Sequence, residues 1–414
     1  MICERGLDNM YIRDTASTSG GILGDLIDFM TLCYIIIIGV SSRIISASAS
    51  NLWCAAIIVL CFLYMGLNNF WTISQYTFSV FLFAFYSLLS LSWSRDVVVS
   101  QERVTTVVLL FVFTSLLHDY LLDEHKQVRY LHMICLGGVL YSIYIILSYG
   151  IGNYISLMTG GNRIGSVFTT YNNNGIGRIM AIVAISCFSV FLNERKNKYL
   201  VFFLLCTVTM LGAGSRTAIG GYTVGLIATL LLKKTRRRYV YVIGGVLTVI
   251  IILYIAQIPA FESISNRINS LIAGLRGDSG ASDYSTLQRM QLNDAAIAQF
   301  QDTPIFGIGI GASSVLTKQI MGHASYMHNN YLEMLCCGGI VGTAIYYLQY
   351  YLPVKQILHD FKNRSDEQTL ALVLIIMYLI MHFGTVSYFD KSVYIHMVLI
   401  HLLAFYQKKE IGNE

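Results

Sequence analysis

Long apolar runs separated by short polar stretches dominate this chain. A run of about 20 apolar residues is long enough to cross a hydrocarbon core about 30 Å thick as a helix. The pattern predicts about twelve such spans, at roughly 24–41, 51–67, 70–92, 104–122, 130–150, 175–192, 199–213, 217–232, 239–258, 329–352, 369–387 and 392–407. We therefore expect an all-α, polytopic membrane protein.

A dense basic run after the eighth span orients the predicted helices. Positive charge in a short loop is retained on the cytoplasmic side of a membrane. The run comprises Lys233, Lys234, Arg236, Arg237 and Arg238. Alternation of the other loops then places both termini in the cytoplasm.

The longest segment between spans divides the chain into three parts. Residues 1–258 hold spans one to nine, and residues 328–414 hold the last three spans and a cytoplasmic tail. Residues 259–327 form an outer loop with a helix-like stretch, Thr286 to Gln301, and the glycine run Gly307 to Gly311. A loop this long is usually functional or disordered, so we expect chemistry here.

Composition supports a membrane protein and narrows the chemistry. Hydrophobic residues make up 55% of the chain and charged residues 12%, against roughly 25% charged in soluble domains. The nine cysteines lie mostly inside apolar runs without metal-ligand spacing, so we interpret them as packing residues. We predict no cofactor, no bound metal and no nucleic-acid partner.

The predicted outer side favours arginine over lysine. Its arginines are Arg43, Arg95, Arg103, Arg163, Arg178, Arg216, Arg267, Arg276 and Arg289, against Lys318 and Lys391 alone among the lysines. A planar, bidentate guanidinium suits phosphate or pyrophosphate better than a hydrated ammonium does. The alternative is that each arginine anchors a helix end to lipid headgroups.

Motifs around the long loop resemble one family. The main stretch comprises Arg289, Pro304, Gly307, Gly309, Gly311, then His328-Asn329-Asn330-Tyr331-Leu332-Glu333 and Gly338-Gly339-Ile340-Val341-Gly342. Two weaker stretches are Gly214-Ser215-Arg216-Thr217-Ala218 and Ser90-Leu91-Ser92-Trp93-Ser94. Together they are similar to motifs of the O-antigen polymerase and O-antigen ligase superfamily of polytopic membrane glycosyltransferases.

The resemblance implies an enzyme of the bacterial inner membrane that acts on its periplasmic side. Its donor would be a glycan on undecaprenyl diphosphate, transferred to an acceptor sugar with inversion and without metal. Partners would be the lipid-linked donor and acceptor, membrane lipids and a chain-length regulator protein. A metal site built from two of four loop acids stays open: Asp278, Asp283, Asp294 and Asp302.

Three residues are predicted to be catalytic. His328 lies where the long loop meets a span, and an imidazole suits either a general base or a diphosphate ligand. Arg216, in a turn between apolar spans, and Arg289 would bind the diphosphate. The structural alternatives are an ordinary helix start for His328 and a salt bridge to Asp294 for Arg289.

Five further residues are predicted to bind substrate: Arg163, Arg276, His323, Asn329 and Glu333. For Asn329 a helix cap is an equal alternative. The glycine run is expected to permit a tight turn rather than to cradle phosphate. His382, His396 and His401 lie inside apolar spans and are interpreted as packing groups.

Three functions compete. A repeat-unit polymerase is favoured over a ligase that moves glycan to lipid A core, because the chain is rich in Ile, Tyr and Asn, as polymerases commonly are. A flippase or transporter is the third hypothesis. Transporters place ionisable groups near the bilayer midplane, whereas these charges gather at one end.

Overall fold

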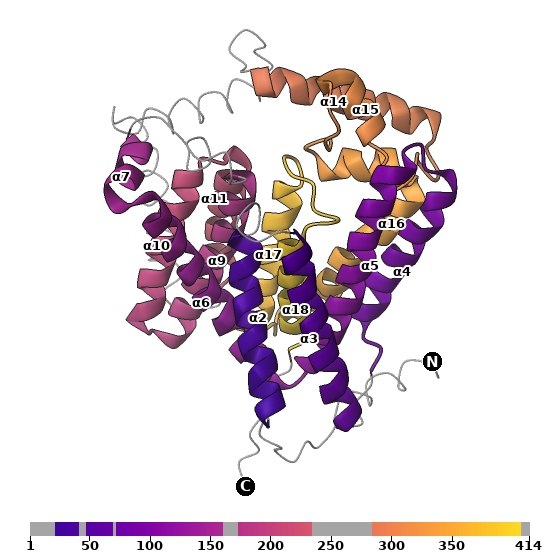
Figure 1. Ribbon diagram of the computed structural model, residues 1–414. Helices are drawn as coiled ribbons and strands as arrows, with labels where there is room; N and C mark the ends of the chain where they lie inside the picture. The colour runs from indigo at the N-terminus through magenta and orange to yellow at the C-terminus, as the bar shows by residue number, and fades with distance from the viewer. Residues whose placement is uncertain (1–20, 41–46, 69–71, 160–172, 234–283, 407–414) are drawn as a thin grey trace.

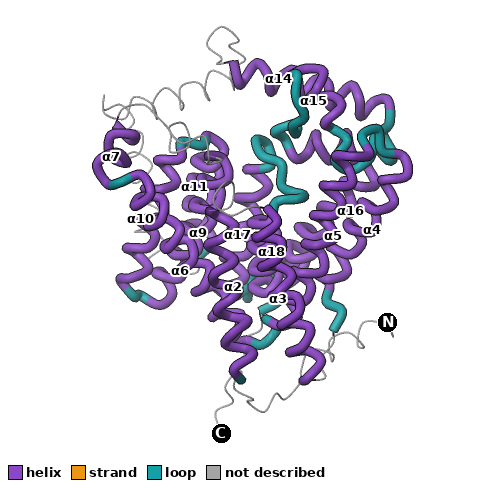
Figure 2. Tube along the Cα trace, viewed as in Figure 1, coloured by secondary structure: helices purple, strands orange, loops and turns teal. Residues whose placement is uncertain are grey.

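The structure, a computed structural model of the 414-residue chain, describes residues 21–40, 47–68, 72–159, 173–233 and 284–406. The predicted span at 239–258 lies outside these residues. Within them every regular element is a helix, and no strand occurs (Figure 2). The predicted all-α fold is confirmed.

The helices follow one another with short connections. They are α2 (Ile22–Val40), α3 (Ala47–Leu67), α4 (Gln75–Ser90), the 3₁₀ turn η1 (Leu91–Trp93), α5 (Val97–Tyr120), α6 (Glu124–Tyr149), α7 (Ile151–Thr159), α9 (Asn173–Glu194), α10 (Asn197–Ala213), α11 (Arg216–Leu232), α14 (Tyr284–Asp302), α15 (Ser314–Met321), α16 (Asn330–His359), α17 (Asp366–Met381) and α18 (Lys391–Ala404).

The predicted spans coincide with these helices. Eleven of the twelve runs lie on helices, and the twelfth is the run outside the described residues. Seven described helices are long and apolar enough to cross a membrane: α2, α3, α4, α5, α6, α9 and α16. Three shorter apolar helices, α10, α11 and α18, accompany them. The chain is therefore a multi-pass membrane protein.

Helix α18 occupies the centre of the bundle (Figure 1). It packs against α2, α5, α6, α16 and α17, and its residues from Ser392 to Ala404 are all buried. On one side of it lie α6, α9, α10 and α11, and on the other α4, α5 and α16, while α2 and α3 pass in front (Figure 1). Helices α14 and α15 cover one end, which we call the α14 face.

The opposite end of the bundle is tied together by matched charges and hydrogen bonds. They join Arg129 to Asp28, His132 to Glu194, Lys233 to Asp366, and Tyr406 to Glu124. These contacts join the ends of α2, α6, α9, α11 and α18 and the starts of α6 and α17. Consecutive spans thus alternate in direction, as predicted from the loop charges.

Helix α16 is broken inside the apolar bundle. Gly339 has φ 59° and ψ −164°, which interrupts the helical hydrogen bonding. An added Cβ there would lie 2.3 Å from the carbonyl oxygen of Ile305, so the position requires glycine. A break in a membrane helix leaves backbone groups that lipid cannot satisfy.

The segment that precedes α15 supplies the missing partners. Four hydrogen bonds join it to the break: Ile340 N–H to Pro304 O (2.8 Å), Val341 N–H to Ile305 O (3.2 Å), Ile308 N–H to Cys336 O (3.1 Å) and Gly309 N–H to Cys337 O (2.9 Å). Gly307 in this segment has φ 65° and lies against the Cys337 backbone. The glycine run therefore acts as a close-packed turn, as expected.

Candidate functional site

His328 lies in the loop between α15 and α16, on the α14 face. Its φ of 57° is in the left-handed region, which costs free energy for a residue with a side chain. The imidazole packs on the ring of Tyr326, with 4.4 Å between centroids. Among the described residues, its buried Nδ1 has no hydrogen-bond partner. A strained backbone and an unsatisfied nitrogen together are typical of a functional position.

Arg289 reaches the same loop from α14. Burial of the imidazole and then the positive charge of Arg289 lower the pKa of His328 to about 4. His328 is therefore neutral at neutral pH and can accept a proton or a hydrogen bond. Two predicted catalytic residues, 39 positions apart in sequence, lie close together.

Tyr326 links this pair to a second cation. Burial raises the pKa of its phenol, whereas the nearby charges of Arg178 and Arg289 oppose that rise. Arg178, in the first turns of α9, is only 4% exposed and forms an ion pair with Asp390. Two guanidiniums from different helices thus flank one tyrosine beside His328.

Sequence reasoning counted Arg178 among the outer arginines but did not select it, and it missed Asp390. The two are 212 residues apart, so no local motif joins them. Asp390 also caps α18 by accepting a hydrogen bond from the N–H of Ser392 (2.9 Å). The one available signal was an arginine inside an apolar run, which needs an anion at such depth.

Arg103 and Phe389 extend the cationic surface. The guanidinium of Arg103, on α5, lies 4.0 Å from the centre of the Phe389 ring. Phe389 in turn lies 6.5 Å from the ring of Tyr326. An arginine on a ring keeps its N–H donors available for an anion, because a cation–π contact occupies only the face of the guanidinium.

Arg216 is the first residue of α11. Ser215 caps this helix by accepting from the N–H of Ala218 (3.4 Å), and Gly177 of α9 packs closely on Ser215. Thr217 lies against Gly384, in the loop between α17 and α18. The half-buried Arg216 therefore stands where the starts of α9 and α11 meet the loop that carries Asp390.

Two of the predicted substrate-binding residues hydrogen-bond to the protein itself. Asn329 is the N-cap of α16, and its Oδ1 accepts from the N–H groups of Tyr331 (3.0 Å) and Leu332 (3.3 Å). Glu333 is 1% exposed and accepts from the Ser313 hydroxyl (2.6 Å) and the Met327 N–H (2.8 Å). Their side chains therefore support the His328 loop.

The remaining candidates are set apart from this cluster. His323 is exposed, and its Nδ1 lies 3.0 Å from the carbonyl oxygen of Met321. Arg163 and Arg276 lie outside the described residues. Within the part of the chain that the structure describes, no group of three or more His, Cys, Asp or Glu side chains could hold a metal ion.

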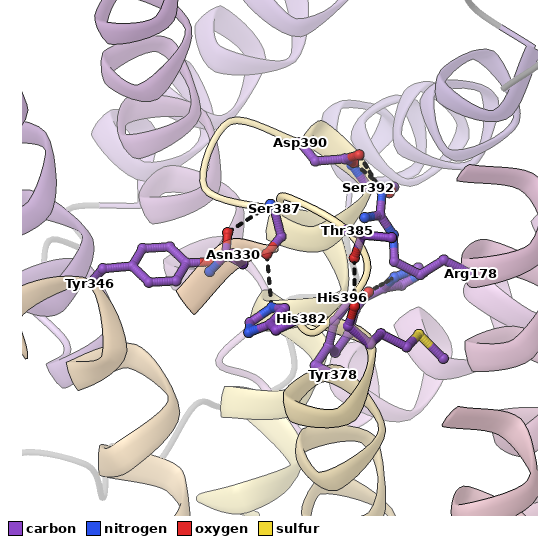
Figure 3. A network of polar contacts seen from close by, with 11 residues as sticks. Arg178, Asn330, Tyr346, Tyr378, His382, Thr385, Ser387, Asp390, Ser392 and His396 are labelled. Atoms are coloured by element: carbon purple, nitrogen blue, oxygen red, sulfur yellow. Dashed lines mark hydrogen bonds and ion pairs between the residues drawn. The ribbon is translucent and has the colours of Figure 1, made fainter. Parts of the chain in front are cut away.

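Behind the site, a buried polar network ties α16 to the loop between α17 and α18 (Figure 3). Asn330 accepts from the N–H of Ser387 (2.9 Å), and the Ser387 hydroxyl lies 2.8 Å from Nε2 of His382. His396 Nδ1 lies 2.5 Å from the Tyr378 hydroxyl. These histidines have protein partners, in keeping with their interpretation as packing groups.

The fold and the site define a polytopic helical membrane protein with a cationic, histidine-bearing cluster at one end. Residues 200–347 match the family described as O-antigen ligase. This match, over about a third of the chain, confirms that the protein is related to the O-antigen polymerase and ligase superfamily, whose members are membrane glycosyltransferases. Comparison with curated proteins gives no match.

Proposed function

We propose that this protein transfers a glycan from a polyprenyl-diphosphate carrier to a sugar hydroxyl at the α14 face. The observation that carries the proposal is the convergence of His328, Arg289 and Arg178 around Tyr326. A diphosphate at the membrane surface needs cations, and its isoprenoid tail needs apolar helices beside them. This bundle offers both in one place.

The reaction requires one proton acceptor and one anion site. The acceptor hydroxyl oxygen attacks the anomeric carbon, and the bond from that carbon to the diphosphate oxygen breaks with inversion. The hydroxyl proton goes to His328, and the polyprenyl diphosphate leaves with the bonding electrons. Arg289 and Arg216 stabilise the charge that develops on the leaving oxygen.

Charge compensation makes His328 a better base when donor is bound. Its pKa of about 4 reflects burial and the charge of Arg289. A diphosphate bound to Arg289 offsets that positive charge and moves the pKa toward the ordinary value of about 6.5. Proton transfer is most efficient when the base has a pKa near the working pH.

Diphosphate is already a good leaving group, so we propose that arginines replace a metal ion. Purified protein in nanodiscs should convert lipid-linked donor to product in excess chelator. Activity that disappears with chelator and returns with magnesium would contradict this mechanism.

For the acceptor, we retain the polymerase, which joins one lipid-linked repeat unit to another. The ligase is the second candidate, because the matching family model is described as O-antigen ligase. The enzyme is offered lipid-linked donor together with either a second lipid-linked repeat unit or lipid A core. Lengthened lipid-linked glycan supports the polymerase, whereas glycan on lipid A core supports the ligase.

The α14 face is proposed to be periplasmic and the opposite face cytoplasmic, with both termini on the cytoplasmic side of a bacterial inner membrane. The Lys233 run at the end of α11 supports this orientation. A reporter inserted after Gly322 should read periplasmic, and one inserted after Lys233 cytoplasmic. The reverse pattern would remove the site from the side where the proposed substrates lie.

A further inference from the structure

We propose that Glu333 is a positioning residue that holds the His328 loop in its working conformation. This inference rests on the proposed function, in which His328 takes the acceptor proton. The sequence predicted substrate contact for Glu333, but its carboxylate lies inside the protein, 1% exposed. Its influence on the reaction would therefore be exerted through His328.

The Glu333 carboxylate joins three segments that meet at the site. Oε2 accepts from the backbone N–H of Met327, the residue before His328, at 2.8 Å. Oε1 accepts from the hydroxyl of Ser313, which ends the glycine turn, at 2.6 Å, and from the hydroxyl of Tyr388 at 3.4 Å. Tyr388 precedes Phe389 and Asp390 in the neighbouring loop.

The bond to Met327 carries the most weight. His328 has φ 57°, a conformation that a residue with a side chain adopts only when its surroundings impose it. The carboxylate supplies this constraint from one side, by fixing the peptide that enters His328. From the other side, Asn329 caps α16 through Tyr331 and Leu332.

Length and charge of the side chain can be separated by substitution. Glu333→Gln keeps the length and one carbonyl oxygen for the Met327 N–H, while its amide donates to the Ser313 hydroxyl, which can also accept. Glu333→Asp keeps the charge but withdraws the oxygens by one methylene, away from Met327. Positioning requires reach, whereas acid–base or electrostatic chemistry requires the charge.

The test measures kcat of both variants in nanodiscs with lipid-linked donor, with Glu102→Met, at an exposed residue of α5, as control. Glu333→Gln should stay within about tenfold of wild type, and Glu333→Asp should lose about 10²-fold, the typical effect of a misplacement near 1 Å. A Gln variant that is the weaker of the two would overturn the proposal.

A double variant asks whether Glu333 acts through His328. If it does, Glu333→Asp should reduce kcat little further once His328→Ala is present, because the positioned group is already gone. Independent, multiplying losses would contradict the proposal.

Hydrogen exchange reads the loop without any activity. Residues 322–329 should exchange faster in Glu333→Asp and at the wild-type rate in Glu333→Gln. Unchanged exchange in Glu333→Asp would refute the positioning role. Full activity of His328→Ala with faster exchange in Glu333→Asp would instead refute the catalytic assignment of His328 and leave the loop contact standing.

Discussion

Two histidines at the α14 end of the bundle are held in opposite ways. His382 is fully buried, and its ring lies within hydrogen-bond distance of Ser387 (2.8 Å), Tyr347 (3.2 Å) and Tyr350 (3.4 Å). His328 is half-buried in a strained loop, and among the described residues its Nδ1 has no partner. One ring completes a network, and the other is kept from completing one.

The difference separates structural from functional polar groups. A buried polar group that is fully hydrogen-bonded stabilises the fold, whereas an unsatisfied one costs free energy that folding alone does not recover. His328 also lies beside Arg289, whose charge disfavours the protonated ring. We infer that His382 serves the fold and His328 serves a ligand, and the following predictions test this contrast.

The largest effect is expected for His328→Ala. Loss of a general base typically reduces turnover by about 10²- to 10⁴-fold. Product formed from lipid-linked donor is measured at matched protein level, with thermal stability in parallel. His125→Ala, at an exposed histidine on the opposite face, is the matched control. Near-normal turnover of His328→Ala would remove it from the site.

Arg289→Lys and Arg216→Lys should each reduce turnover by about 10²- to 10³-fold, because lysine keeps the charge but loses the bidentate fork. Arg129→Lys, on the opposite face, should have little effect, since its partner Asp28 accepts from either cation. The same assay applies. If the three lysine variants behave alike, guanidinium geometry plays no part in catalysis.

His382→Ala should act on stability rather than on chemistry. It leaves buried partners such as the Ser387 hydroxyl unsatisfied, at a cost of about 1–3 kcal/mol in the free energy of unfolding. Unfolding in mixed micelles measures this cost, and turnover is expressed per folded molecule. A folded His382→Ala protein with turnover reduced as strongly as in His328→Ala would erase the contrast.

The smallest effect concerns pH. With the pKa of His328 lowered to about 4, the ring stays neutral above that value, so kcat/KM should be nearly constant from pH 5 to 8. It should fall only as pH drops through about 4. Because the unfolded ring titrates at about 6.5, protonation favours unfolding, and stability also declines between these values. Arg289→Gln should move the acid limb upward. An acid limb near pH 6.5 in wild type would contradict the buried environment.

Apolar periodicity was sufficient to predict the spans, because lipid demands about 20 apolar residues per helix whatever their partners. It could not predict the break at Gly339, since a glycine pair in a membrane helix usually permits close packing without any break. The motif did identify His328 and Arg289. It could not reveal that Glu333 faces inward, because that depends on Ser313 and Met327 lying where the chain returns.

The broken helix α16 has a consequence for how this protein can be varied. The backbone groups exposed at Gly339 are satisfied only by the turn from Pro304 to Gly309, which lies upstream in the chain. Each unsatisfied group inside a membrane costs several kcal/mol, so turn and helix must match. Chimeras between relatives should therefore tolerate exchange of residues 303–342 as one cassette, and fail when a junction separates the turn from its helix.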